Sequence, residues 1–362
     1  PLDGSDGDVG VRVPEFYICV KDTGTKYQLW ISDFNIDGTF TRVHPFIISH
    51  TKTMTRTRED GKEEVFSACI KPDDTRYLGG NKSSSVVATK LQGRPRTGIS
   101  YDKANEFCIN RGDYITIIDY LEYCALQALC YIEYANFDNQ ATLNTNLTSE
   151  GFKQGGLGAG VTNLDSNRWT VFNGNNPIVQ TYWTAEHNIG NGSTNGDHYE
   201  LENYNADGSN LNTYPAVYRG ILNFFGDIWT FIRDVVIINK DTNYNSVYLL
   251  KKGVNHSDVT KDNINEKCYF IGDQANSNDF ITEFDFRFGP YFVPNKIGTN
   301  KKADYNWIRG NNGQDTDKAV RVLLLGGGAA NGSGVGSGGF LSRWVRSASA
   351  ALVGFFTTVK LD

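Results

Sequence analysis

"AVRVLLLGGGAANG", residues 319–332, places an apolar strand pattern directly before a run of glycines. Such a run fits a phosphate-binding loop, a flexible linker or an ordered surface segment. The following stretch, "GGFLSRWVRSASAALVGFF" at 338–356, ends in a second apolar strand pattern. Because strand patterns flank the glycine-rich stretch at both of its ends, we predict an ordered surface there and not a linker.

Gly334, Gly336 and Gly339 match the G-x-G-x-x-G spacing of dinucleotide-binding proteins. That fingerprint requires the glycines at a strand-to-helix turn and an acidic residue about 20 positions later. Here the preceding strand pattern ends at Leu325, well before the match, and no Gly-Lys-Ser/Thr follows to form a P-loop. The sequence therefore predicts no phosphate site and no cofactor.

Composition excludes several classes of partner. The 362 residues carry a formal charge of −6 without a basic run, so nucleic acid is not an expected partner. No stretch approaches about 18 consecutive apolar residues, so membrane insertion is not expected. The five histidines lack zinc-site spacing, and the early aspartates lack the glutamate that ends a calcium loop, so no metal site is predicted.

The cysteines are too sparse for a disulfide scaffold. Three of them fall inside helical patterns, where a thiol serves as a small apolar group. We therefore predict six free, inert thiols: Cys19, Cys69, Cys108, Cys124, Cys130 and Cys268.

Local patterns predict an α+β chain. Residues 11–50 read as hairpins, and a short helix follows from a Ser100 N-cap to a Gly112 stop. A second helix begins at the capping box of Asp119 and Glu122. Its predicted buried face is Leu121, Ala125, Ala128, Leu129 and Ile132.

The rest of the chain alternates between loops and strands. Residues 136–220 show no helical period and are expected to form long ordered loops, whereas strand patterns return after residue 233. We predict two helices plus antiparallel strands and long ordered loops, with no fixed repeat.

Two segments together carry a resemblance to a known family. "YRGILNFFGDIW" at 218–229 contains a Gly-Asp-x-Trp turn, and 319–332 contains an Arg-x-Leu-x-x-Gly-Gly pattern. This pair resembles the C-type lectin-like fold of the formylglycine-generating-enzyme type. The resemblance is closest to the variable proteins of diversity-generating retroelements, including receptor-binding tail proteins of phages of gut Bacteroidales. It extends over most of residues 40–362, leaving 1–39 as an N-terminal β-hairpin or connector segment.

The resemblance implies that the first segment packs beneath the second and that a C-terminal variable region covers 325–356. In that family the region is rewritten at codons whose products exclude Lys, Glu, Gln, Met and Trp. Residues 325–356 contain no Lys, Glu, Gln or Met, although Trp344 departs from this alphabet. The family ends the region Gly-Phe-Arg, so Phe356 is either a substituted position or evidence of a shifted boundary.

The resemblance also implies a set of ligand-binding side chains displayed on the surface. Arg343, Trp344 and Arg346 would be the energetic anchors, because Trp and Arg dominate interface hot spots. The predicted ligand-binding residues are Gly328, Ala329, Ala330, Asn331, Ser333, Val335, Ser337, Leu341, Ser342, Arg343, Trp344, Val345, Arg346, Ser347, Ala348, Ser349, Ala351, Leu352 and Phe356.

A second set of residues is predicted to hold the fold. The glycines among them would supply turns that only glycine adopts at low cost. The set comprises Gly226, Asp227, Trp229, Arg321, Gly326, Gly327, Gly332, Gly336 and Gly354. The enzymes of this fold use cysteines near the C-terminus, whereas the last cysteine here is Cys268, so no catalytic residue is predicted.

We therefore expect a non-enzymatic receptor-binding protein of a phage tail fibre, located in the virion. Its expected partners are a bacterial cell-surface protein or glycan receptor and other tail or fibre subunits, and the tail-fibre context implies a homotrimer. One alternative is a bacterial surface or pilus-tip adhesin with the same variable face. A second alternative is a virion enzyme that degrades glycans, since a pair of carboxylates need only meet in space.

Overall fold

Strands dominate the architecture. The computed structural model describes residues 3–70, 77–81, 93–137, 181, 216–299, 304–308, 319–328, 331, 334–350 and 352–361. Across these residues, three α-helices accompany six sheets. The predicted α+β class is confirmed, while the C-type lectin-like subtype and the division at residues 39 and 40 stay predictions.

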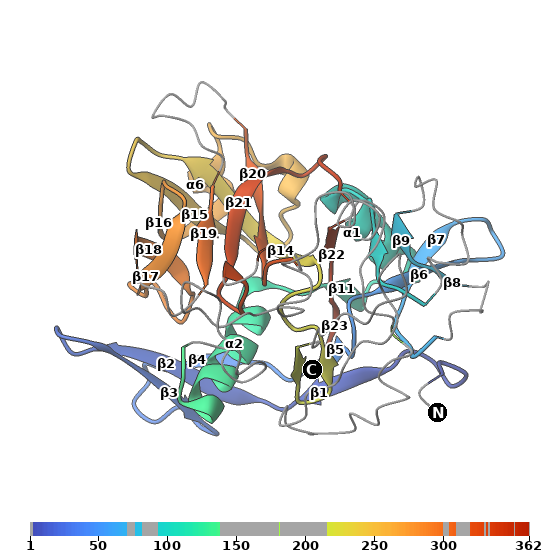
Figure 1. Ribbon diagram of the computed structural model, residues 1–362, viewed down its shortest axis with the longest axis horizontal. Helices are drawn as coiled ribbons and strands as arrows, with labels where there is room; N and C mark the ends of the chain where they lie inside the picture. The colour runs from blue at the N-terminus through green and yellow to red at the C-terminus, as the bar shows by residue number, and fades with distance from the viewer. Residues whose placement is uncertain are drawn as a thin grey trace, which may run out of the picture.

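A nine-stranded sheet is the largest sheet in the described part of the chain (Figure 1). Its order is β16-β15-β14-β20-β21-β19-β17-β18, and β22 pairs with β14. Asn295 of β18 donates to the carbonyl of Asp273 in β16 at 3.0 Å, so the two ends of the sheet meet and the sheet is nearly closed. The strands are β14 (Trp229–Asn239), β15 (Tyr244–Leu250), β16 (Cys268–Ala275), β17 (Asp279–Asp285), β18 (Val293–Gly298), β19 (Tyr305–Trp307), β20 (Arg321–Leu325), β21 (Phe340–Val345) and β22 (Val353–Gly354).

The N-terminal strands belong to two different sheets. The predicted hairpin forms β2 (Phe16–Asp22) and β3 (Tyr27–Ser32), and β4 (Thr41–Val43) pairs with the other edge of β2. β1 (Gly10–Val13) instead pairs with β5 (Phe46–Ser49). It thereby enters a four-stranded sheet with β23 (Thr357–Lys360) and β11 (Ile115–Ile117).

The remaining elements are short. They are β6 (Met54–Thr57), β7 (Glu63–Phe66), β8 (Tyr77–Leu78), β9 (Gly80–Asn81), β10 (Arg96–Thr97), β12 (Val217–Tyr218), β13 (Ile221–Leu222), the 3-10 turn η3 (His256–Asp258) and α6 (Ile264–Lys267). Most strand pairs are antiparallel as predicted, but three described pairs are parallel: β22 with β14, β19 with β21, and β10 with β9.

Both predicted helices are confirmed with their caps. α1 (Tyr101–Arg111) starts at Ser100, whose hydroxyl accepts from the Lys103 amide, and ends at Gly112. α2 (Tyr120–Tyr134) starts with the capping box of Asp119 and Glu122, in which both reciprocal hydrogen bonds are present. Thus local hydrogen-bonding chemistry sets both helix starts.

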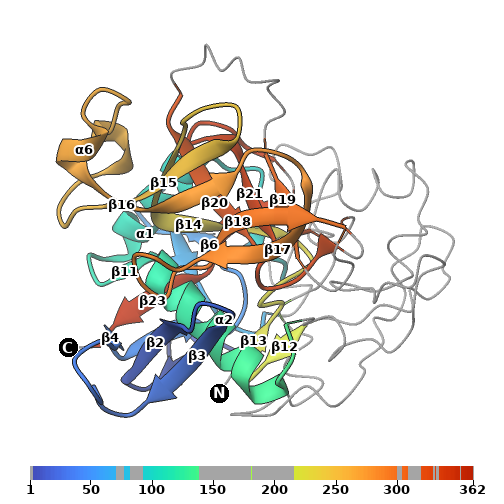
Figure 2. The same cartoon turned by 90° about the vertical axis from the view of Figure 1, so that its left-hand side faces the viewer.

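The predicted face of α2 is only partly correct. Ala125 and Ala128 are buried, but Ile132 is 44% exposed and the most enclosed side chains include Tyr120 and Tyr123. Figure 1 and Figure 2 show the reason, because α2 lies between the large sheet and the β2–β3–β4 sheet. A helix covered on two sides buries more than one stripe, and large Tyr rings fill the wider space.

The two segments that carry the family resemblance pack together as expected. The Gly226 amide donates to the carbonyl of Gly326 at 2.9 Å, and Thr230 pairs with Leu325 in the sheet. Gly226, Gly326 and Gly327 have φ values of 79°, 88° and 74°, which glycine adopts without strain. These turns hold the start of β14 against the end of β20.

A buried lysine forms hydrogen bonds to the turn that precedes β14. Lys52 is 1% exposed, and its ammonium donates to the carbonyls of Asn223 and Gly226. Its Nζ also lies 5.0 Å from the centre of the Phe356 ring. Burial lowers the pKa of Lys52 to about 7, and the nearby Asp227 opposes that shift. One buried amino group therefore joins three segments that are distant in sequence.

Gly327→Ala is expected to destabilise the protein more than Gly24→Ala. Both positions have positive φ, but a Cβ at Gly327 would meet Val335 at 3.0 Å, whereas a Cβ at Gly24 would meet nothing within 4 Å. The control should lose about 1 kcal/mol from backbone strain alone. Chemical denaturation of the two variants measures the difference, and equal losses would contradict the tight packing at Gly327.

Lys52→Met is expected to flatten the pH dependence of stability. Between pH 7 and 10.5 the unfolded lysine holds a proton that the folded one has lost, so this group makes stability rise with pH. The free energy of unfolding of the wild type minus that of Lys52→Met should rise by about 1 kcal/mol per pH unit near pH 8. Lys252→Met, at an exposed lysine, is the matched control. Parallel curves for wild type and Lys52→Met would contradict the burial argument.

Candidate functional site

Strand β21 divides into a buried half and an exposed half. Phe340, Leu341 and Ser342 are buried, whereas Arg343 is exposed and Trp344 is half-buried. The pairing with β20 shifts register between Val322 and Leu324, so the strand changes its relation to the core in the same place. After this irregularity, residues 343–349 are exposed or half-buried. We call residues 343–349 the surface strip.

Backbone hydrogen bonds tie the strip and its exit to buried elements. The amide of Ala348 donates to the carbonyl of Val345 at 3.0 Å, which closes a turn. Ser349 bridges to Ser100, just ahead of α1, and the Gly98 amide donates to Ala350 at 3.0 Å. The strip is therefore an ordered surface whose main-chain hydrogen bonds are satisfied locally and by neighbouring elements.

One side chain of the strip is paired with α1. The guanidinium of Arg346 lies 3.0 Å from the carboxylate of Asp102, and both are about half exposed. The buried His256 imidazole packs against Tyr101 with ring centres 5.3 Å apart. Burial lowers the pKa of His256, the Arg346 charge lowers it further, and Asp102 opposes this effect. Sequence spacing gave no signal for Asp102 or His256, because each contact joins distant parts of the chain.

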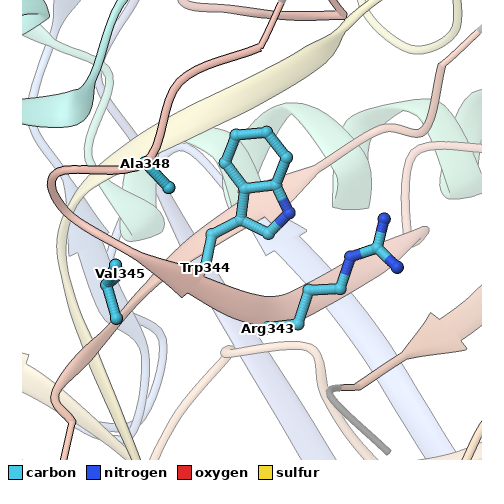
Figure 3. Close-up of a pocket in the computed structure, with 4 residues that line it drawn as sticks. All are labelled: Arg343, Trp344, Val345 and Ala348. Atoms are coloured by element: carbon cyan, nitrogen blue, oxygen red, sulfur yellow. The ribbon is translucent and has the colours of Figure 1, made fainter.

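A hollow of about 260 Å³ opens in the strip, lined by Arg343, Trp344, Val345 and Ala348. Figure 3 shows the indole of Trp344 between Ala348 and the Arg343 side chain, with the indole nitrogen on the edge that faces Arg343. The floor is apolar and the Arg343 end carries a charge. Such a hollow is large enough to hold a side chain of a partner.

The prediction of surface display is wrong for six residues. Their environments explain why, because Val335 is packed against Gly327 and Phe356 against Lys52, while Leu341 lies opposite Leu324 within the sheet. The buried residues are Gly328, Val335, Ser337, Leu341, Ser342 and Phe356. Glycine-rich backbone can approach core rings closely, so this stretch enters the interior instead of covering it.

The other predicted ligand-binding residues divide into two groups. Asn331 and Leu352 are half-buried, and Asn331 accepts from the Gly328 amide at 2.8 Å. The strip residues Arg343, Trp344, Val345, Arg346, Ser347, Ala348 and Ser349 are exposed or half-buried. Ala329, Ala330, Ser333 and Ala351 lie outside the described residues. Ligand binding by the accessible set stays a prediction.

Most residues predicted to hold the fold occupy tight positions. Asp227, Trp229 and Arg321 are buried. A Cβ on Gly354 would lie 2.6 Å from Ile228, and the Gly336 carbonyl accepts from Gly339 at 3.0 Å. Gly332 lies outside the described residues.

A buried polar cluster supports the glycine-rich stretch from below. Asp304 accepts from the Tyr131 hydroxyl at 3.0 Å and from the Gly338 amide at 2.9 Å, and Gln127 donates to the Tyr131 oxygen at 2.8 Å. A Cβ on Gly338 would lie 2.3 Å from the Asp304 carboxylate. Glycine at 338 therefore allows a carboxylate to bind the backbone directly.

The thiols are free and buried, as predicted. Burial raises the pKa of Cys124, Cys130 and Cys268, which keeps these groups protonated. Cys69 lies 3.3 Å from the Nε2 atom of His50, a contact that the sequence did not suggest. Both side chains are enclosed, and burial lowers the pKa of His50 to about 4, so this pair belongs to the core.

Clustered carboxylates are engaged in structural contacts. Asp119 caps α2 and binds Lys360 at 2.7 Å, and Glu122 accepts from Thr358 at 2.9 Å. Burial raises the pKa of Glu122 to about 8, with Asp119 adding to the shift. Among the residues that the structure describes, no group of three or more His, Cys, Asp or Glu side chains could hold a metal ion. Nor is any described helix both long and apolar enough to span a bilayer.

The fold and the strip define an α+β protein, rich in strands, that presents a short aromatic and cationic surface on a packed core. No protein-family model and no curated protein sequence matches the chain. A solved structure described as "Major Tropism Determinant M1 Variant" is similar over 96% of this chain and 72% of that chain, with 11% identity and a TM-score of 0.28. That TM-score is too low to support a conclusion about fold or function.

Arg343→Ala and Arg346→Ala are each expected to change the free energy of unfolding by less than about 0.5 kcal/mol, because exposed charges contribute little to stability. Trp344→Ala should cost about 2 kcal/mol, since its half-buried ring packs against the core. Thermal and urea unfolding of the three variants test this ranking. A large loss on replacing either arginine would place it among the structural residues.

Proposed function

We propose that this chain is a non-enzymatic receptor-binding protein whose contact surface is the strip at residues 343–349. One observation carries the proposal: the strip is accessible to solvent while its backbone is hydrogen-bonded to buried parts of the fold. A surface built this way can change side chains without losing its scaffold. Arg343, Trp344 and Arg346 supply the residue types that dominate binding energy at interfaces.

The composition of residues 325–356, which include the strip, supports the proposal that the strip is part of a diversified region. Residues 325–356 lack Lys, Glu, Gln and Met, as the resemblance to retroelement variable proteins implies. Trp344 departs from that alphabet, and its half-buried ring packs on the core. A fixed, partly structural Trp flanked by replaceable neighbours explains both facts. On this proposal Arg343 and residues 345–349 are the replaceable positions among those described.

We place the protein on the virion as a tail-fibre subunit that attaches to a protein or glycan on the bacterial surface, and we propose a homotrimer with other tail proteins as neighbours. The C-type lectin-like subtype belongs to the same proposal. A cellular or pilus-tip adhesin would use the same strip. The neighbouring DNA tests whether the chain is a variable protein of a diversity-generating retroelement, because a reverse transcriptase gene and a near-identical template repeat of codons 325–356 are expected beside the gene of either candidate.

The double replacement Arg343→Ala with Arg346→Ala should strongly weaken adsorption to a gut Bacteroidales strain that the wild-type protein binds. Fluorescent protein and flow cytometry measure the adsorption, with an expected loss of roughly tenfold or more in apparent affinity. Arg42→Ala is the matched control, since Arg42 is an exposed arginine paired with Glu15 on another sheet. Unchanged adsorption by the double variant would remove the strip from the binding surface.

A further inference from the structure

The hollow in the strip presents donors and apolar surface together. Arg343 and the Trp344 indole offer only N–H donors, and Val345 and Ala348 offer carbon. The four lining side chains include no acceptor group. Figure 3 shows the indole nitrogen on the edge of the ring that faces Arg343, so both kinds of donor serve the same end of the hollow. A matching ligand must bring acceptors to that end and an apolar group to the other.

The two arginines of the strip differ in their partners among the described residues. Arg346 is already paired with Asp102 at 3.0 Å. Arg343 is exposed, and across the described residues its guanidinium has no hydrogen-bond or ion-pair partner. The whole chain carries a formal charge of −6, so Arg343 is a local positive site on an acidic molecule. A single carboxylate complements it, and a planar carboxylate can accept two parallel bonds from a guanidinium.

The size and lining of the hollow favour a protein side chain over a free ligand. A volume of about 260 Å³ lies below the range of roughly 300–1,000 Å³ typical of small-molecule sites. A sugar ring would bring hydroxyl donors into a lining that offers no side-chain acceptor. An apolar side chain fits against Trp344, Val345 and Ala348 without leaving such donors unpaired.

We propose that this hollow binds a protein receptor through an acidic side chain placed beside an apolar one, with the carboxylate on Arg343 and the apolar group against Trp344. The inference rests on the proposed function, because it names the partner chemistry of the same strip. It assigns Arg343 as the residue that selects a carboxylate.

The test uses intact cells of a strain that the wild-type protein binds, in three treatments. Surface proteolysis removes protein receptors, periodate oxidises glycans, and carbodiimide with ethanolamine converts surface carboxylates to neutral amides. We expect proteolysis and amidation to abolish adsorption and periodate to leave it unchanged. Arg343→Ala should weaken adsorption to untreated cells by roughly tenfold to a hundredfold, as loss of a charge-assisted hydrogen bond implies.

Two comparisons isolate the carboxylate. On amidated cells the wild type and Arg343→Ala should adsorb equally weakly, whereas Arg343→Lys should keep part of the preference for untreated cells. Arg42→Ala should behave as the wild type throughout. Adsorption that survives proteolysis and is lost with periodate would overturn the protein-receptor inference while leaving receptor binding intact. If the wild type adsorbs to no strain of a broad panel, the proposed function itself fails.

Discussion

The hydrogen bonds of the buried Lys52 amino group are the interaction on which the arrangement of the C-terminal part depends. A charge inside a protein is costly unless polar groups surround it. Here the carbonyls of Asn223 and Gly226 supply those groups, and the Phe356 ring supplies its face. The turn before β14 and the chain between β22 and β23 must therefore both reach Lys52 for its amino group to be buried with partners. Positive-φ glycines make these approaches feasible.

Paired strands of the large sheet connect this junction to the surface strip. β14 pairs with β15, β20 and β22, and β20 in turn carries β21. The surface strip begins where β21 leaves the core, three residues after Phe340. Its position is set by hydrogen bonds of buried strands and by the contact with α1. Among its side chains, Trp344 packs against the core and Arg346 pairs with Asp102 of α1.

Sequence patterns predicted the elements that depend on local chemistry. Ser100 and Asp119 start helices because their side chains accept from nearby amides, and the apolar runs of β14 and β20 form strands. Patterns failed where burial depends on distant partners. Ile132 was expected to be buried and is exposed, because the sheets that pack against α2 come from residues far away in the chain.

The glycine-rich stretch shows a second limit of sequence patterns. Hydrophobic periodicity measures where side chains point, and a residue without a side chain gives no such signal. Val335 and Ser337 stand among such glycines, so no periodicity opposed the surface position that the resemblance implied for them, although both are fully buried. The pairing of Arg346 with Asp102 was equally hidden, since the two residues are 244 positions apart.

These contacts limit how far a region such as 325–356 can vary. At Gly338 any side chain would collide with Asp304, and at Val335 a polar replacement would be buried next to Gly327. Replacements of this kind cost several kcal/mol, a large share of the stability of an ordinary domain. Exposed positions such as Arg343 and Ser347 carry no comparable penalty. Selection for folding would therefore remove most variants changed in the buried part and retain those changed in the strip, so that diversity at the surface arises even when the whole region is rewritten.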